Sequence, residues 1–272
     1  MSARVDIPAL ARGVATCVRD IGCQLWEWEI ESVDYKGNDP QDLVSNLDRR
    51  VQAALGTRLQ ALCPAGFYAE EKDNRPIEGL TWIVDPIDGT TNFVSRKRDF
   101  AISVALYDGS EPLLGVVFDV ERGDLYSAIK GGGAYLNGLA LDRPVDRPLS
   151  ACILEMSIGT LRNLMRRTDA GLLNISREVR ATRAMGCGSL AICQIATGRT
   201  QLYLSSRLRP WDHAAARVIL EELGGVLVPL FPSAQPGVDP FLSADPLPLL
   251  CAANQALADD IIHRYFSPVK DN

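Results

Sequence analysis

Apolar residues are spaced in two different ways along this chain, and the change from one pattern to the other limits the folds it can adopt. Over residues 7–28 and 43–62 they recur every three or four positions. This spacing predicts two amphipathic helices, the second with Asp42 as its N-cap. From Phe67 onward the apolar runs are short and rich in β-branched and aromatic residues, which predicts strands. We therefore expect two helices followed by a sheet.

Glycine, proline and aspartate separate the later apolar runs and mark where elements end. The apolar runs at 81–85, 100–107 and 113–120 predict strands, and residues 124–138 predict a hairpin whose glycine cluster forms the turn. After Ser150 strands and helices alternate, which predicts a mixed α/β chain of one large domain or of two packed halves, residues 1–150 and 151–272. In that second half we expect strands at 151–158, 201–205 and 249–253, helices near 160–171 and at 188–198, 210–225 and 254–266, and a surface loop at 229–248.

Composition excludes some classes of function. The 272 residues carry a net charge of −6 with a pI near 5.1, which argues against nucleic acid as the main ligand. The sequence has neither a signal-peptide pattern nor about 18 consecutive apolar residues, so we expect no membrane segment and a cytoplasmic location. Seven cysteines without a CxxC pair fit reduced thiols. With only His213 and His263, a His-based triad or a multi-histidine metal site lacks the residues it needs.

Acidic residues gather in three short segments, AEE at 69–71, DPIDG at 85–89 and Asp212 behind Trp211. Each segment alone has an ordinary explanation, as a solvated surface pair, a turn, or an acid at a helix start. Together they provide the oxygen ligands that Mg²⁺ prefers. Two such ions about 3.5–4 Å apart can bridge a phosphoryl group, one activating a water and the other stabilising the leaving oxygen. The combination favours metal-assisted phosphate hydrolysis, which needs no histidine.

The segment around Asp85 also has the local pattern of an anion site. Asp85 ends the predicted strand 81–85, Gly89 permits a tight turn, and residues 90–92 can begin a helix. Backbone N–H groups at such a helix start face whatever the neighbouring carboxylates hold. A divalent cation together with a phosphate group satisfies both halves of this arrangement.

These segments resemble the sequence motifs of the inositol monophosphatase family. WIVDPIDGTTNF at 82–93 and RPWDHAAARVILEELGG at 209–225 are similar to its two signatures, AEE at 69–71 to its glutamate motif, and KGNDPQDLVSNLD at 36–48 to its N-terminal segment. The resemblance extends from about Lys36 to about Tyr265. It implies an α/β fold, a layered α-β-α-β-α sandwich of the sugar-phosphatase type, usually dimeric. It also implies a magnesium-dependent, lithium-sensitive phosphatase that acts on a small soluble phosphate ester.

The resemblance also implies a set of metal ligands. One Mg²⁺ is expected at Glu70, Asp85 and the carbonyl of Ile87, and a second at Asp85, Asp88 and Asp212, so that Asp85 bridges the two. Glu70 is also expected to serve a third, weaker ion.

Further residues are assigned to the water and to the substrate by the same resemblance. Thr90, paired with Asp48, is expected to help activate the water together with Glu70, and Gly89 and Thr90 to present N–H groups to the phosphate. The substrate-binding residues implied in this way are Gly89, Thr90, Asp88, Ser205 and Asp212.

Substrate choice is less certain, because the sequence departs from the family pattern there. Animal members place a glutamate that reads inositol hydroxyls six residues before the tryptophan of the second signature, where this chain has Ser205. Arg183, Arg207 and Arg209 lie near the expected pocket rim, where they can bind a second anionic group, pair with acids, or contact a second subunit. Ala69 replaces a glycine, and 187–189 replaces a more typical small-residue run.

Different classes of function therefore remain open. The first is hydrolysis of inositol monophosphate or a similar polyol phosphate, with relaxed discrimination. The second is hydrolysis of fructose 1,6-bisphosphate, a 3′-phosphonucleotide or histidinol phosphate by a related phosphatase. A non-enzymatic binding member is expected to lose metal ligands, and a purely structural protein leaves the matched acids unexplained.

Overall fold

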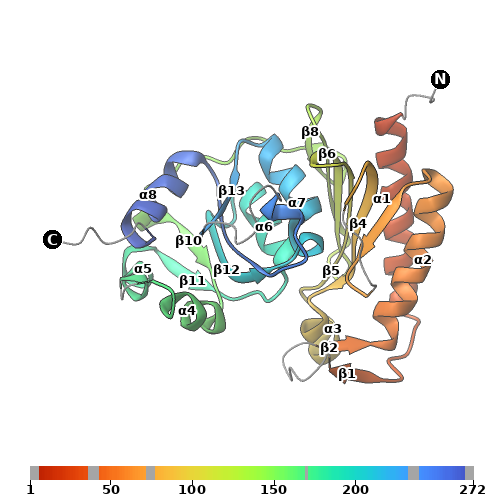
Figure 1. Cartoon of the computed structure of the whole chain (residues 1–272), viewed down its shortest axis with the longest axis horizontal. Coiled ribbons are helices and arrows are strands. Elements are labelled where there is room, and N and C mark those ends of the chain that lie inside the picture. Colours follow the sequence, from red (N-terminus) through yellow and green to blue (C-terminus); the bar gives the residue numbers. More distant parts are fainter. Residues whose placement is uncertain (1–5, 36–42, 72–76, 169–170, 232–238, 267–272) are drawn as a thin grey trace.

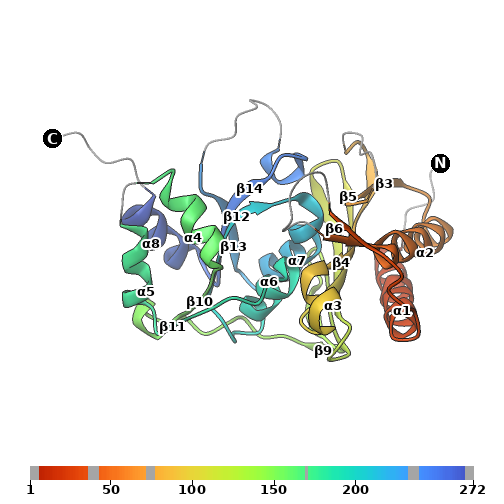
Figure 2. The same ribbon diagram turned by 90° about the horizontal axis from the view of Figure 1, so that it is seen from below.

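The structure is a computed structural model that describes residues 6–35, 43–71, 77–168, 171–231 and 239–266. Helices and sheets alternate in five layers, two helices, a large sheet, two helices, a smaller sheet, and three helices (Figures 1 and 2). This confirms the expected α-β-α-β-α sandwich. No helix in the described ranges has both the length and the apolar composition needed to cross a membrane.

The first layer consists of α1 (Ile7–Leu25) and α2 (Asn46–Leu62), which cover one face of the second layer, a seven-stranded sheet. The sheet order follows the chain order from β3 to β9, and only the β3–β4 pair is parallel. Its strands are β3 (Gly66–Ala69), β4 (Leu80–Asp88), β5 (Ala101–Asp108), β6 (Glu111–Asp119), β7 (Asp124–Ile129), β8 (Gly133–Leu136) and β9 (Leu139–Ala140). The predicted hairpin over 124–138 is the β7–β8 pair.

The other sheet has the order β11-β10-β12-β14-β13. Helices α6 (Gly188–Ala196) and α7 (Pro210–Glu222) lie between the two sheets, and α4, α5 and α8 cover the outer face. The bounds are β10 (Ile153–Glu155), β11 (Ala181–Arg183), β12 (Leu202–Leu208), β13 (Val226–Pro229), β14 (Leu247–Ala252), α4 (Ile158–Met165), α5 (Ile175–Glu178) and α8 (Gln255–Tyr265). Outside the layers, β1 (Val33–Tyr35) pairs with β2 (Leu43–Ser45), and α3 (Thr90–Arg96) follows β4.

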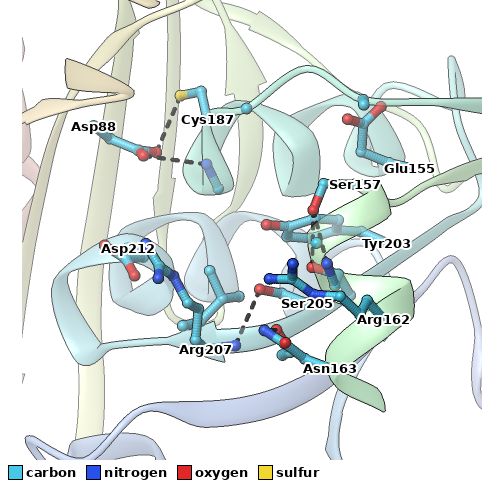
Figure 3. Close-up of a pocket in the computed structure, with 17 residues that line it drawn as sticks. Asp88, Glu155, Ser157, Arg162, Asn163, Cys187, Tyr203, Ser205, Arg207 and Asp212 are labelled. Atoms are coloured by element: carbon cyan, nitrogen blue, oxygen red, sulfur yellow. Dashed lines mark hydrogen bonds between the residues drawn. The ribbon is translucent and has the colours of Figure 1, made fainter. Parts of the chain in front are cut away.

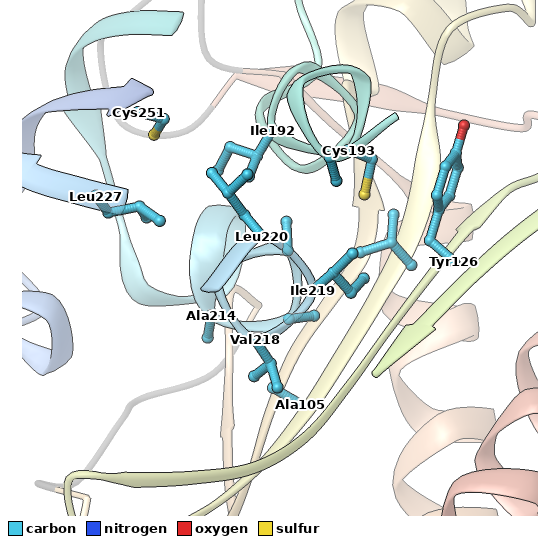
Figure 4. Close-up of a cluster of buried hydrophobic side chains, with 14 of the residues drawn as sticks. Ala105, Tyr126, Ile192, Cys193, Ala214, Val218, Ile219, Leu220, Leu227 and Cys251 are labelled. Carbon is cyan, nitrogen blue, oxygen red and sulfur yellow. The ribbon is translucent and has the colours of Figure 1, made fainter. Parts of the chain in front are cut away.

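The middle helices fix the distance between the sheets. Side chains from both helices form a buried cluster with residues of the two sheets, including Ile192, Ile219 and Leu220 (Figure 4). A Cβ atom on Gly115 of β6 would lie 2.2 Å from the carbonyl oxygen of Ala215, so only glycine allows α7 to approach the large sheet this closely. The N-terminal ends of α6 and α7 are thereby held against the end of β4.

Some predicted boundaries were wrong. The second helix begins at Asn46 with Ser45 as its N-cap, because Leu43–Ser45 pairs with β1 as a strand; Asp42 lies outside the described residues. The helix predicted near 160–171 is α4, which is shorter and starts at Ile158. The predicted loop 229–248 includes the end of β13, a short turn of 3-10 helix at Pro240–Leu242 and the start of β14, with 232–238 outside the described residues.

Candidate active site

Asp85 and Asp88 face the same side because of an irregularity in β4. The pairing of β4 with β5 runs regularly to Asp85–Ser103 and then shifts, so that Asp88 pairs with Ala101. Three residues of β4 thus oppose two of β5, which is a β-bulge. In a regular strand residues three apart point to opposite faces. The bulge reverses the alternation, so Ile87 packs in the core under α1 and α2 while Asp88 turns toward α6 and α7. Contrary to the prediction, Asp85 lies inside the strand and not at its end.

The turn after the bulge requires a glycine. Gly89 has φ 89° and ψ 39°, the left-handed region, and a Cβ atom there would lie 3.1 Å from the carbonyl oxygen of Asp99. α3 begins at the next residue, as predicted. The Thr90 hydroxyl lies 3.1 Å from Asp48 Oδ1 and 3.0 Å from the carbonyl oxygen of Ile87, so its single proton can bond to either acceptor.

Asp48 is fixed from behind by the start of α2. Its Oδ2 accepts hydrogen bonds from the Ser45 backbone N–H at 2.8 Å and from the Ser45 hydroxyl at 2.6 Å. The residue is fully buried. The capping box of α2 therefore orients the carboxylate that holds the Thr90 hydroxyl.

Asp212 reaches the same place from the first turn of α7. Pro210 occupies the start of the helix as predicted, and Asp212 Oδ2 accepts the backbone N–H of Arg209 at 2.8 Å. Oxygen atoms of Asp85, Asp88 and Asp212 lie within 4.8 Å of one another. Burial, and then the negative charges of Asp88 and Glu70, raise the pKa of Asp212 well above its usual range. Carboxylates gathered in this way are stabilised when a cation neutralises them, so this donor set fits a divalent metal.

Asp88 is anchored by the N-terminal end of α6. Its Oδ2 accepts hydrogen bonds from the Ser189 N–H and hydroxyl, both at 2.6 Å. Oδ2 also accepts the Cys187 thiol at 3.0 Å, while Oδ1 accepts the Gly188 N–H at 3.1 Å (Figure 3). Burial raises the pKa of Cys187 well above its usual range, so the thiol keeps the proton that it donates. Thus α6, in the second half of the chain, fixes the carboxylate of Asp88, which belongs to the first half.

Two adjoining cavities meet at these carboxylates. The first, here called the carboxylate cavity, has a volume of about 410 Å³, and its lining includes Glu70, Asp85, Ile87, Asp88, Gly89, Thr90, Arg209 and Asp212. The second, the side cavity, has a volume of about 350 Å³, and its lining includes Glu155, Ser157, Arg162, Asn163, Tyr203 and Ser205. Asp88, Gly186, Arg207 and Asp212 line both cavities.

The predicted site residues divide between these cavities. The predicted metal and phosphate residues all line the carboxylate cavity, and Asp48 lies behind Thr90. Ser205 lies in the side cavity, apart from the metal cluster. Of the three arginines, Arg207 lines both cavities, whereas Arg209 lines the carboxylate cavity and donates to the carbonyl oxygen of Ala244 at 2.7 Å. Arg183 donates to the carbonyl oxygen of Thr182 at 2.8 Å.

Sequence reasoning missed most of the side cavity. Glu155 on β10, Arg162 and Asn163 on α4, and Tyr203 on β12 all line it. None stands in a motif, and their segments are separated by up to 50 residues of chain. The alternation of strands and helices after Ser150 was the only signal, and it does not say which side chains point inward.

Comparison with known proteins places the whole chain in one group. The model of the inositol monophosphatase family matches residues 2–267. The inositol-1-monophosphatase of Bacillus subtilis is 34% identical over 76% of this chain and 80% of that protein. Inositol monophosphatase 1 of Solanum lycopersicum is 34% identical over 73% and 76%.

A solved structure supports the same grouping. Inositol monophosphatase II of Staphylococcus aureus is 30% identical, with 96% of each chain covered and a TM-score of 0.79. That phosphatase has also been solved with inositol monophosphate bound and with 2′-AMP bound.

Proposed function

This chain belongs to the inositol monophosphatase family, and from that premise we propose that it is a magnesium-dependent hydrolase of small phosphate monoesters whose reaction takes place in the carboxylate cavity. The observation that carries the proposal is the convergence of Asp85, Asp88 and Asp212, with oxygen atoms within 4.8 Å of one another. Three buried or partly buried carboxylates in one place repel each other unless a cation is bound.

The residues that would hold two or three Mg²⁺ ions are Asp85, Asp88, Asp212, Glu70 and the carbonyl group of Ile87. Glu70 lies outside the group of three and lines the same cavity. Bound Mg²⁺ would supply an activated water and would offset the charge of the phosphate group. The anchoring of Asp88 by α6 keeps one of these ligands in a fixed orientation before any ion binds.

The protein groups around the phosphate then have separate tasks. The Thr90 hydroxyl, held by Asp48, orients the attacking water and can pass a proton toward the Asp48 carboxylate. The backbone N–H groups of Gly89 and Thr90, which line the cavity where the chain turns into α3, are assigned to phosphate oxygens. Glu70, which lines the same cavity, is assigned to help activate the water.

The alcohol part of the ester would occupy the side cavity, next to Asp88 and Asp212. Inositol monophosphate or a similar polyol or sugar phosphate is the leading substrate, supported by the names of the relatives and by the bound inositol monophosphate of the S. aureus structure. The second candidate is an ester of the type of fructose 1,6-bisphosphate, a 3′-phosphonucleotide or histidinol phosphate, and the 2′-AMP complex of that protein supports the nucleotide among them.

Assembly and location are part of the proposal. We expect a cytoplasmic homodimer, and the seven cysteines, all without a disulfide partner, fit a reducing compartment. Residues 1–150 and 151–272 are proposed as two packed halves, which agrees with the origin of the two sheets in separate parts of the chain. Light scattering in solution measures the oligomeric state.

The proposal is tested by release of phosphate from a panel of esters, with the enzyme first stripped of metal and then supplied with Mg²⁺. We expect no turnover after stripping and recovery on adding Mg²⁺, because the clustered carboxylates need a cation. Lithium is expected to inhibit by occupying a magnesium site. Full activity of the metal-free enzyme would contradict the role assigned to the carboxylates.

A further inference from the structure

The side cavity has a cationic group where the family pattern has an anionic one. Ser205 on β12, in the place of the glutamate that reads polyol hydroxyls in animal members, offers only a short neutral side chain. Arg162 of α4 lines the same cavity, and Figure 3 shows its side chain reaching in from the helix to the region of Ser205. Arg162 therefore places a positive charge where the alcohol part of a substrate would bind.

The position of Arg162 follows from the way α4 is fixed. The Ser157 hydroxyl caps the helix by accepting the Thr160 N–H at 3.0 Å, and Leu164 is fully buried in the core. On the cavity side, Asn163 donates a hydrogen bond to the Ser206 hydroxyl of β12 at 3.3 Å. These contacts direct the exposed side of the first turns of α4 into the side cavity.

Arg162 is available for a ligand. Among the described residues its guanidinium has no hydrogen-bond or ion-pair partner, and the residue is exposed. Arg207, which lines both cavities, adds a second guanidinium between this place and the carboxylates. A guanidinium presents a planar set of N–H donors that matches the oxygens of a phosphate or carboxylate group.

Among the described residues, Glu155 is the one acid on the cavity wall outside the metal cluster, and its carboxylate is already engaged. The residue is only 4% exposed and accepts the backbone N–H of Met185. Arg183, its neighbour on β11, opposes the rise in the pKa of Glu155 that burial causes. Figure 3 shows Glu155 on the wall away from Arg162. Glu155 is suited to accept a hydroxyl of the substrate, whereas Arg162 is suited to bind an anion.

We propose that the alcohol part of the substrate carries a second anionic group, a phosphate or a carboxylate, which binds Arg162 beside Ser205 in the side cavity. This inference rests on the proposed phosphatase function and narrows its substrate class. A neutral polyol leaves the guanidinium without a charged partner, whereas a second oxyanion forms a charge-assisted contact with it. The same arrangement accounts for a serine at position 205, because a glutamate there would pair with Arg162 and compete with the anion.

The test uses pairs of esters that differ in one anionic group. Glycerol 2-phosphate is compared with 2-phosphoglycerate, which adds a carboxylate, and fructose 1-phosphate with fructose 1,6-bisphosphate, which adds a phosphate. Free Mg²⁺ is held constant, since the added group also binds the ion. We expect kcat/KM to be roughly tenfold or more higher for the anionic member of at least one pair, and the pair identifies which oxyanion is recognised.

Substitutions assign that preference to a residue. In Arg162→Gln the ratio of kcat/KM within the preferred pair should fall toward one, and in Arg162→Lys part of it should remain. Arg166→Gln is the matched control, because Arg166 is an exposed arginine at the end of the same helix and does not line the cavity. Added salt should also lower the ratio in the wild type, since an exposed guanidinium is screened.

Equal kcat/KM within both pairs, or a ratio unchanged in Arg162→Gln, would overturn the second-anion site while leaving the phosphatase function intact. Failure of the wild type to hydrolyse any of the four esters, and inositol 1-phosphate as well, with Mg²⁺ would instead contradict the proposed function. All three variants are checked for an unchanged thermal unfolding midpoint, so that a loss of fold is not mistaken for a loss of recognition.

Discussion

The carboxylate cavity and the side cavity share a wall but are built in opposite ways. A large part of the carboxylate cavity comes from one short segment, 85–91, whose side chains are directed by a β-bulge and a left-handed glycine. The side cavity collects side chains from β10, α4 and β12, far apart in the sequence. Backbone geometry thus fixes the groups assigned to the chemistry, and longer side chains on separate elements line the place assigned to the alcohol.

The two cavities also differ in the charged groups that line them. In the first, burial and then the neighbouring negative charges raise the pKa of Asp212 well above its usual range. In the second, Arg162 adds a positive charge, and Arg207 lies on the wall that both cavities share. A doubly anionic ester fits this division, because its transferred phosphate needs a bound cation, whereas its second anion meets the arginines directly. Substitutions in the first cavity should therefore affect turnover of all esters, and those in the second only the choice among them.

The largest effect is expected for Asp85→Asn in the carboxylate cavity. The amide keeps the shape of the side chain but removes the charge of the proposed bridging ligand, so kcat should fall by orders of magnitude for every ester while the fold survives. Initial rates at saturating Mg²⁺ and a thermal unfolding curve measure both. Asp119→Asn is the control, because Asp119 is a buried aspartate at the end of β6 that lines neither cavity. Near-normal turnover of Asp85→Asn would remove Asp85 from the proposed ligands.

A smaller effect is expected for Ser189→Ala, at the wall that the cavities share. Loss of the 2.6 Å hydrogen bond to Asp88 Oδ2 leaves this ligand with fewer groups to orient it. Changes at such outer partners typically cost on the order of tenfold or more in metal affinity or activity, so the Mg²⁺ concentration for half-maximal rate should rise about tenfold. Thr197→Ala, which removes a hydroxyl from the other end of α6, should leave the Mg²⁺ concentration for half-maximal rate unchanged. An unaltered Mg²⁺ requirement in Ser189→Ala would show that α6 does not position Asp88 for the metal.

The smallest effect is expected for Ser205→Glu, which places a carboxylate in the side cavity. The new side chain can accept polyol hydroxyls and can pair with Arg162. The ratio of kcat/KM for inositol 1-phosphate to that for an anionic ester should therefore rise roughly tenfold, with kcat for glycerol 2-phosphate changed far less. Measurement of all three esters on one enzyme preparation gives the ratio directly. A uniform loss across the esters would indicate that the side chain disturbs the carboxylate cavity and not the choice of substrate.

The sequence by itself determined the layered fold and the contents of the carboxylate cavity. The spacing of apolar residues predicted most helices and strands, and the contiguous segment DPIDGTT contains several of the predicted ligands and the turn before α3. Local signals failed where long-range pairing decided the outcome. Residues 43–45 continue the helical spacing of α2, yet they form a strand because β1 is there to pair with them.

Only the tertiary structure decided which residues line the side cavity and how Asp88 is held. Arg162, Ser205 and Glu155 line one cavity because α4, β12 and β10 pack against one another. The four hydrogen bonds to Asp88 require α6 to begin beside the bulge of β4. The physical reason is that a turn or a bulge is specified by neighbouring residues, whereas the direction of a side chain on a packed element depends on distant contacts. For this protein, the groups assigned to the chemistry stand in short sequence motifs, whereas the residues that line the proposed substrate site are brought together only by the packing of distant elements.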